Sequence, residues 1–209
     1  MSNTQTTLRE RQVKATHDLI LEVAMRLMHE NPNGPFSHEI IAEAAGIGAR
    51  TVYRHFPTRD DLLQAMWIRL RDKTGTRFPE SEDEIVPLIR MAFSNFEEHE
   101  ALVRASLQAA GSTIRDRGAI EGRPAFRKSL AAILDGLPPE EERRLVAVCL
   151  AIYSAPFWQL LRDRGLLSGR EAGEAAAWAI DMILQSARAA SQKSERQTAT
   201  SAGEGEKHE

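Results

Sequence analysis

The chain has 209 residues, of which 42 % are hydrophobic, and a formal net charge of −3. This length allows one medium domain or a small domain joined to a larger one, and the charge excludes a polycation, so any nucleic-acid contact must come from a local patch. The single cysteine, Cys149, excludes an intramolecular disulfide framework and a cysteine-rich metal site.

The N-terminal stretch "MSNTQTTLRERQ" is polar and has none of the features of a signal peptide. No apolar run reaches the ~18 residues that a membrane span requires, and a single cysteine suits a reducing compartment. We therefore expect a cytoplasmic protein. Long Ala-, Leu- and Ile-rich stretches with few β-branched clusters predict an all-α fold.

Four helices are predicted in the first part of the chain, separated by glycine and proline. Ser37 can cap the second helix, and Gly46 ends it in a tight turn. Thr58 can cap the fourth, whose first turn holds two acids where the helix dipole favours them. The expected ranges are 9–30, 37–45, 48–56 and 58–73.

A polar, breaker-rich segment, "GTRFPESEDE" at 75–84, predicts a domain boundary. Beyond it, helices are expected near 84–98, 100–114, 122–136, 139–164 and 168–192. The predicted organisation is a disordered N-terminus at 1–8, an N-terminal domain at 9–75, a larger helical domain at 76–192 and a disordered tail at 193–209.

The stretch "GIGARTVYRHFPTRDDLL" holds three arginines, a histidine and a tyrosine before its first acid, Asp60. Two short helices joined by a glycine turn, after a longer first helix, are the parts of a helix-turn-helix. Its second helix enters the major groove of DNA, so a carboxylate on that helix would meet a phosphate. Val52 and Phe56, at i and i+4, are expected to face the core with Ile47. Ala49, Arg50, Tyr53 and Arg54 are expected on the opposite side.

The chemistry of each side chain suggests its contact. Arg50 can donate two hydrogen bonds to guanine, worth ~1–3 kcal/mol of base discrimination. Hydroxyl, imidazole and further guanidinium groups suit phosphates, which set register. Ser37 and His38, at the start of the second helix, can also contact the DNA backbone through the N–H groups at that helix's N-terminus. The predicted DNA-binding set is Ser37, His38, Gly48, Ala49, Arg50, Thr51, Tyr53, Arg54, His55 and Arg59.

The stretch "IIAEAAGIGARTVYRHFPTRDDLLQAM" resembles the signature of TetR/AcrR-family transcriptional regulators. The similarity covers about residues 9–70 and rests on the succession of glycine turn, Tyr and Phe-Pro. The resemblance implies that Tyr53 and His55 contact phosphates and that Arg59 completes the phosphate clamp. It also implies that Arg50, Thr51 and Arg54 face the groove.

Two positions depart from this pattern. Gly48 stands where such proteins usually have Ser or Thr, so a capping hydroxyl and a phosphate contact are missing, although glycine is a tolerable N-cap. Ala49 is small where many relatives carry a longer polar residue. Both departures concern base preference rather than DNA binding itself.

The resemblance implies that the helices beyond residue 84 form a ligand pocket and a dimer surface. Pro156 inside a helical pattern is expected to kink helix 139–164 and leave a carbonyl unpaired, with a cavity beside it. Large apolar residues at helical spacing serve either the core or a pocket, and core packing is the commoner role. The predicted ligand-binding set is Phe93, Phe96, Leu107, Phe126, Tyr153, Phe157, Trp158 and Trp178.

Small Ala and Gly residues beside Trp178 allow close helix approach. Helices 145–164 and 168–192 are therefore expected to form a four-helix interface in a homodimer. A charge at Ala177 or Ile180 would then give monomers. Cys149 lies among apolar residues and is expected to be an inert, buried thiol.

These features predict a dimeric, sequence-specific repressor that leaves a near-palindromic operator when a small hydrophobic or aromatic effector binds. A ligand-independent or activating regulator fits the same residues. An enzyme does not: "HEIIA" at 38–42 lacks the second histidine of a zinc protease, and the sequence has no G-x-S-x-G, P-loop or dinucleotide fingerprint. No cofactor or metal is expected.

Overall fold

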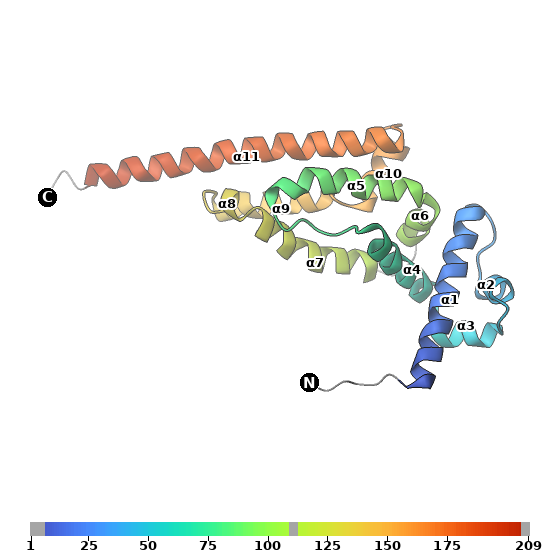
Figure 1. Cartoon of the computed structure of the whole chain (residues 1–209). Helices are drawn as coiled ribbons and strands as arrows, with labels where there is room; N and C mark the ends of the chain where they lie inside the picture. Colours follow the sequence, from blue (N-terminus) through green and yellow to red (C-terminus); the bar gives the residue numbers. More distant parts are fainter. Residues whose placement is uncertain (1–6, 109–112, 206–209) are drawn as a thin grey trace. The chain divides into compact units, whose positions relative to one another are not determined.

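The computed structural model describes residues 7–108 and 113–205, with side chains over 7–107 and 120–193 (Figure 1). Over the described ranges the chain forms eleven α-helices, one short 3-10 helix and no strand, which confirms the predicted all-α fold.

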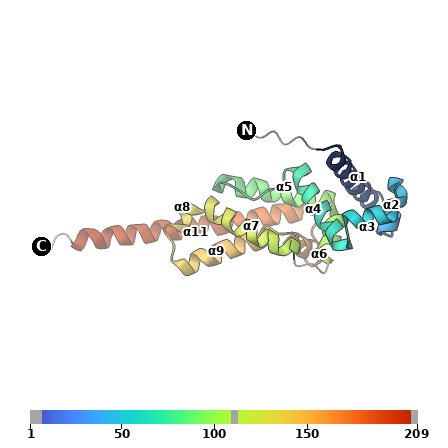
Figure 2. The same cartoon turned by 90° about the horizontal axis from the view of Figure 1, so that it is seen from below.

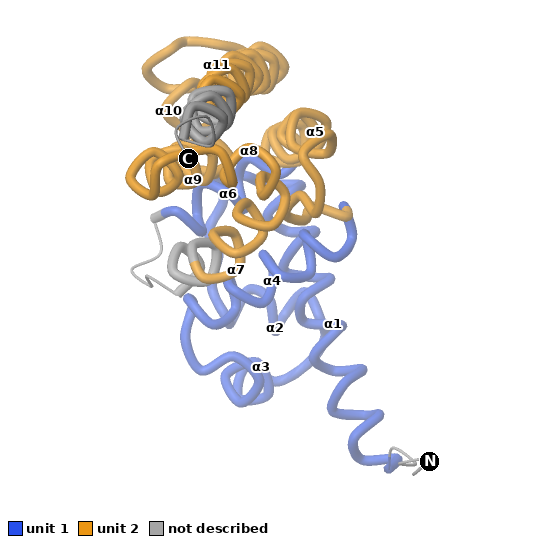
Figure 3. Tube along the Cα trace, turned by 90° about the vertical axis from the view of Figure 1, so that its left-hand side faces the viewer, with its two compact units in different colours: residues 1–74, 99–111 blue, residues 75–98, 112–209 orange. Residues whose placement is uncertain are grey.

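The chain divides into two compact units, shown in different colours in Figure 3. The first comprises residues 1–74 and 99–111, and the second residues 75–98 and 112–209. The predicted domain bounds stay a prediction; in the division into two units, the second unit begins at residue 75. One difference is that α6 (Glu100–Gln108) packs with the first unit, although its sequence lies inside the predicted second domain.

The first unit begins with four helices that stop and start at the capping residues expected. They are α1 (Leu8–Glu30), α2 (His38–Ala45), α3 (Ala49–His55) and α4 (Arg59–Thr74). The hydroxyl of Ser37 accepts from the backbone N–H of Ile40 at the start of α2. The Thr58 hydroxyl accepts from the N–H of Asp61, while that carboxylate accepts from the Thr58 N–H, 3.1 and 3.0 Å respectively. Both predicted caps are confirmed, and together they set the ends of the helix-turn-helix.

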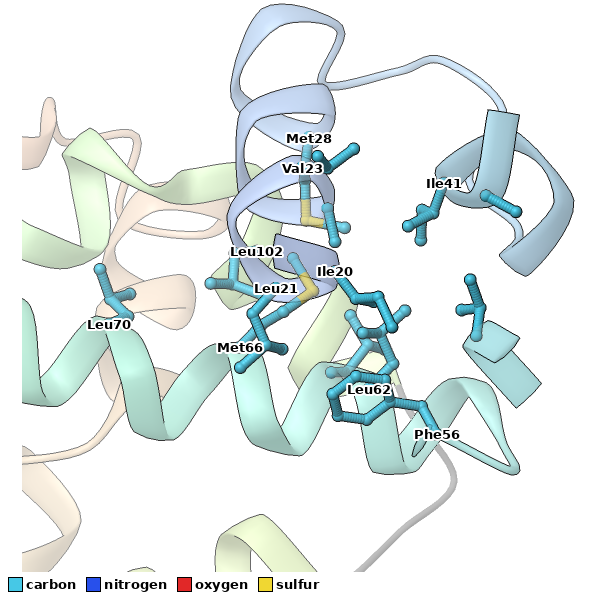
Figure 4. Close-up of a cluster of buried hydrophobic side chains, with 14 residues drawn as sticks. Ile20, Leu21, Val23, Met28, Ile41, Phe56, Leu62, Met66, Leu70 and Leu102 are labelled. Carbon is cyan, nitrogen blue, oxygen red and sulfur yellow. The ribbon is translucent and has the colours of Figure 1, made fainter. Parts of the chain in front are cut away.

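An apolar core holds these helices together, and α1 packs against α2, α4 and α6. Figure 4 shows the side chains of α1 and α4 converging, with Ile41 of α2 and Leu102 of α6 completing the cluster. Leu102 explains why α6 belongs to this unit, because burying an apolar side chain in that core is worth ~1.5–3 kcal/mol. Fully buried members include Ile20, Ile41, Val52, Leu63 and Met66.

The second unit is a helical assembly in which α5 (Ile85–Glu98) runs along α11 (Gly169–Gly205), as Figures 1 and 2 show. A 3-10 turn, η1 (Glu82–Glu84), precedes α5. The remaining helices are α7 (Thr113–Ser129), α8 (Ala131–Leu134), α9 (Pro139–Ile152) and α10 (Ala155–Asp163). α7 packs on α9, and α9 and α10 both pack on α11.

Helix α7 differs from the sequence-based expectation of a helix at 122–136. It runs through Gly122 and Pro124 and ends at Ser129. A Cβ at Gly122 would lie within 2.7 Å of the Phe78 ring and 2.6 Å of a Leu150 methyl carbon. Tight packing, rather than helix termination, therefore requires the glycine there.

The expected kink at Pro156 is a complete break. α9 ends at Ile152, and the Ser154 hydroxyl accepts from the Phe157 N–H to start α10 at a bend of 62°. Pro156 lies in the first turn of α10, where its missing N–H has no helical acceptor to lose. No carbonyl is therefore left unpaired by the proline, and the expected helix 139–164 is corrected to two helices.

No described helix is by itself long and apolar enough to cross a membrane, and only α9 and α10, taken together across their bend, have that length and composition.

Helix α11 corrects two expectations. It continues to Gly205, past the predicted start of the disordered tail at 193, while residues 206–209 and the N-terminal residues 1–6 lie outside the described ranges. Its small residues Ala176 and Ala177 face the protomer's own core and are 0 % exposed, as is the larger Ile180. A Cβ at Gly173 would lie 3.4 Å from Phe93 of α5. The Ala/Gly stripe therefore brings α11 close to α5.

The single cysteine lies in the core of this unit. Burial raises the pKa of the Cys149 thiol to about 12, so the thiol is protonated at neutral pH. This agrees with the expected inert role.

Candidate nucleic-acid interface

The turn between α2 and α3 positions the second helix of the pair. Gly46 has φ 65° and ψ 30°, the left-handed conformation that glycine adopts without steric cost. The Ile47 N–H donates to the Ala42 carbonyl at 3.0 Å, which closes the end of α2. The chain then enters α3 through Gly48, which makes no side-chain cap. The missing hydroxyl was expected from the sequence.

Helix α3 has one apolar face and one polar face. Val52 is 0 % and Phe56 3 % exposed, so the predicted inward pair is confirmed. On the other side, Arg50 and Arg54 are exposed and Tyr53 is 45 % exposed. Ala49 differs from its predicted outward position, because it is half-buried against the core; Thr51 is also half-buried. The exposed face therefore presents two guanidinium groups and one phenol.

Tyr53 is held by two residues of α2. Its ring stacks on that of His38, with centroids 4.4 Å apart and planes 5° apart. Its hydroxyl donates to the carboxylate of Glu39 at 2.8 Å. This hydrogen bond lowers the pKa of Glu39 and raises that of Tyr53, because it favours the charged carboxylate and the neutral phenol.

The side chain of His38 has a structural role inside the first unit. Its side chain is 6 % exposed, and its Nε2 lies 2.8 Å from the Phe56 carbonyl oxygen. Because a carbonyl only accepts, Nε2 carries the proton. His38 thus ties the first turn of α2 to the end of α3 and supports the Tyr53 ring. The expected contact of His38 with the DNA backbone, through the N–H groups at the start of α2, stays a prediction.

His55 also points inward. Its ring lies 6.1 Å from that of His17 of α1, edge to face, and its buried Nε2 has no hydrogen-bond partner among the described residues. The side chain faces α1, because α3 turns this edge toward the first helix. The side chain of His55 therefore packs between the two helices, and its expected phosphate contact stays a prediction.

The position of His55 predicts acid sensitivity. Burial and the nearby charge of Arg54 lower its pKa below the ordinary 6.5. Between that lowered pKa and 6.5, the unfolded chain binds more protons than the folded one, so stability falls as the pH falls through this window.

We expect the thermal unfolding midpoint of the wild type to drop by a few degrees more than that of His55→Gln when the pH is lowered from about 7.5 to about 5.5. Circular dichroism melts across this range measure the difference. An identical acid-induced drop in both proteins would contradict the prediction.

The remaining predicted DNA contacts lie at helix starts. Ser37 is half-buried, with its hydroxyl committed to the α2 cap. Gly48 is exposed at the start of α3. Arg59, the first residue of α4, is exposed with its guanidinium carbon 6.0 Å from the centre of the Phe36 ring. This cation–π contact holds the Arg59 side chain over the α1–α2 loop.

The predicted ligand-binding residues fall into separate places. Leu107 is half-buried in the first unit. In the second unit, Phe93, Phe96 and Trp158 form one aromatic group, with successive centroids 5.8 and 6.1 Å apart. Phe157 is half-buried on α10.

A second aromatic group surrounds Tyr153. The rings of Phe78 and Phe126 lie 5.7 and 5.6 Å from it, and its hydroxyl donates to the Arg77 carbonyl at 2.7 Å. Burial raises the pKa of Tyr153, so the phenol remains a neutral donor. The polar tip of this core residue is therefore already satisfied within the protein.

Trp178 is the clear exception, because it is 68 % exposed on α11 and does not line an interior site. Met182, one turn further, is 50 % exposed. The two form an apolar patch on the outer face of α11. Val148 of α9 and Leu160 of α10 are also exposed, at 42 % and 53 %. The expectation that charges at Ala177 or Ile180 disrupt an interface is wrong, since both lie in the protomer's core.

Sequence reasoning missed Glu39. The helix α3 segment is free of acids, but folding brings the Glu39 carboxylate of α2 against Tyr53, 14 residues further along the chain. Helical periodicity assigns Glu39 to a face of α2 but carries no information about which α3 side chain lies opposite. The close-packed turn between the helices decides that contact.

Known proteins resemble this chain in both units. Residues 20–66 match the model of the bacterial regulatory proteins of the tetR family. Over 73 residues the chain is 32 % identical to the HTH-type transcriptional repressor LfrR of Mycolicibacterium smegmatis, covering 35 % of this chain and 38 % of that protein. The crystal structure of a TetR transcriptional regulator from Rhodococcus sp. RHA1 is 26 % identical, with a TM-score of 0.53, and the likeness covers 82 % of this chain and 98 % of that one.

Proposed function

Because this chain is a TetR-family transcriptional regulator, a DNA-binding protein rather than an enzyme, we propose that it acts in the cytoplasm as a dimeric repressor. A small hydrophobic or aromatic effector releases it from a near-palindromic operator. The observation that carries this proposal is the exposed face of α3. Arg50, Tyr53 and Arg54 lie on that face, and the opposite face of the helix is apolar and buried. LfrR of M. smegmatis, which matches this chain over part of its length, is named a repressor, and this supports repression rather than activation.

Each exposed group suits one part of a DNA duplex. Arg50, in the first turn of α3, can donate two parallel hydrogen bonds to guanine O6 and N7. Arg54, one turn later, and Arg59 at the start of α4 suit the groove edge and the phosphates. Tyr53 contributes a hydroxyl donor, and its ring is already held in place by stacking on His38. A preformed arrangement of this kind reduces the entropy lost on binding.

We propose a dimer because the DNA-binding face of one α3 helix is small. A single helix-turn-helix binds weakly, whereas two linked copies gain affinity from the high effective concentration of the second site. We assign the dimer surface to the exposed apolar residues of the last three helices, namely Val148, Leu160, Trp178 and Met182. Exposed large apolar side chains on helices that pack together, as α9 and α10 do on α11, favour a protein partner.

The effector is proposed to bind the second unit. Its two aromatic groups, around Trp158 and around Tyr153, offer flat apolar surfaces that suit a hydrophobic or aromatic molecule. Binding would favour a conformer whose two α3 helices no longer match the spacing of the half-sites. Release is then a shift of population and requires no chemical step.

The test is selection of bound fragments from random and genomic DNA by the purified protein, followed by fluorescence anisotropy titrations at several salt concentrations. We expect a near-palindromic site and a log K that falls by ~0.9 per phosphate neutralised for each unit of log salt. A screen of hydrophobic compounds for release of that site then tests the effector. Failure to enrich any sequence would refute the proposed regulator, and a site released by no compound would refute the effector.

A further inference from the structure

An acid lies within the exposed basic face of the first unit. Glu39, in the first turn of α2, accepts a hydrogen bond of 2.8 Å from the hydroxyl of Tyr53. Both side chains are exposed. A carboxylate beside a phosphate-binding group opposes binding by charge repulsion. Glu39 therefore places a negative charge where Tyr53 would meet a phosphate.

The ring of Tyr53 has little freedom to avoid this acid. It lies flat on the His38 ring at 4.4 Å, and His38 is 6 % exposed and hydrogen-bonded to the Phe56 carbonyl. The stack therefore fixes the ring relative to both α2 and α3. Only the hydroxyl proton can change direction, by rotation about its C–O bond.

That hydroxyl has one proton and can serve one acceptor at a time. A carboxylate oxygen and a phosphate oxygen are acceptors of the same kind, both anionic. The Tyr53 hydrogen bond lowers the pKa of Glu39, so the carboxylate stays ionised at neutral pH. A phosphate that takes this proton must therefore displace an anion that already holds it.

We propose that Glu39 is an intramolecular competitor of the DNA backbone, which occupies the Tyr53 hydroxyl in the free protein and thereby weakens DNA binding. The inference rests on the proposed function, because it needs Tyr53 to meet a phosphate. Since phosphates carry no sequence information, the effect is the same on operator and on random DNA. Glu39 thus limits the sequence-independent part of the affinity.

The test uses Glu39→Gln, which keeps an oxygen acceptor at the same place and removes its charge. Glu43→Gln is the matched control, because Glu43 is exposed on the same helix one turn further on. We expect Glu39→Gln to tighten binding to operator and random duplexes alike by about three- to tenfold, and Glu43→Gln by less than about twofold. Anisotropy titrations at one fixed salt concentration measure both, with circular dichroism to confirm that each variant is folded.

The Tyr53→Phe background isolates the contact. There, Glu39→Gln is expected to tighten binding no more than Glu43→Gln does, and the carboxyl pKa of Glu39, followed by NMR, is expected to rise toward its ordinary value. Equal gains from the two glutamine variants, a gain that persists in Tyr53→Phe, or weaker binding by Glu39→Gln would each overturn the proposal. Absence of DNA binding by the folded wild type is a different result, which would refute the proposed function.

Discussion

Replacing Trp178 with glutamate is expected to convert the proposed dimer into folded monomers and to weaken operator binding by about a hundredfold or more. The side chain is 68 % exposed on α11, so a charge there costs little in the isolated protomer. In a dimer, the same charge would be buried against apolar side chains of the partner, which is strongly unfavourable. The loss of affinity follows because each monomer then binds only one half-site.

Light scattering coupled to size exclusion measures the mass, and anisotropy on operator DNA measures the affinity. Ala190→Glu is the matched control, since Ala190 is exposed on the same helix, more than three turns beyond Trp178 and off the line of the Trp178–Met182 patch. A Trp178→Glu variant that remains dimeric would place the interface elsewhere. Ile180→Glu is unsuitable for this test, because Ile180 is 0 % exposed and a charge there would unfold the protomer.

Replacing Arg50 with alanine is expected to weaken binding to the best operator by about ten- to a hundredfold, while weakening binding to random DNA much less. A bidentate contact to guanine is worth ~1–3 kcal/mol of discrimination, and that energy is lost only where the guanine is present. Arg50 is exposed in the first turn of α3, the part of the helix that meets base edges.

The comparison with Tyr53→Ala makes this prediction specific. Loss of a phosphate contact is expected to weaken binding to all sequences alike. Repeating the fragment selection with each variant shows which base positions lose their preference. If Arg50→Ala kept the wild-type base preference, the assignment of Arg50 to the groove would be wrong.

The local pattern of the sequence predicted the helix-turn-helix with little error. Ser37, Gly46 and Thr58 mark ends of helices through their own backbone preferences and hydrogen bonds, which act within a few residues. Val52 and Phe56 are one turn apart, so they share a face of α3 whatever lies around them. The same reasoning was less successful beyond residue 112. There, Gly122 and Pro124 lie inside α7 instead of ending it, because tertiary packing outweighs local propensity.

In the helix-turn-helix, the sequence by itself determined where the helices begin and end and that Val52 and Phe56 face inward, because these properties depend on neighbours within about one turn. Only the tertiary structure decided what covers each face. It turned His38 and His55 inward and placed Glu39 against Tyr53. It also packs the Ala/Gly stripe of α11 against α5 and leaves Trp178 exposed. The physical reason is that periodicity defines a direction from the helix axis, whereas the residue met in that direction is set by close packing of segments far apart in the chain.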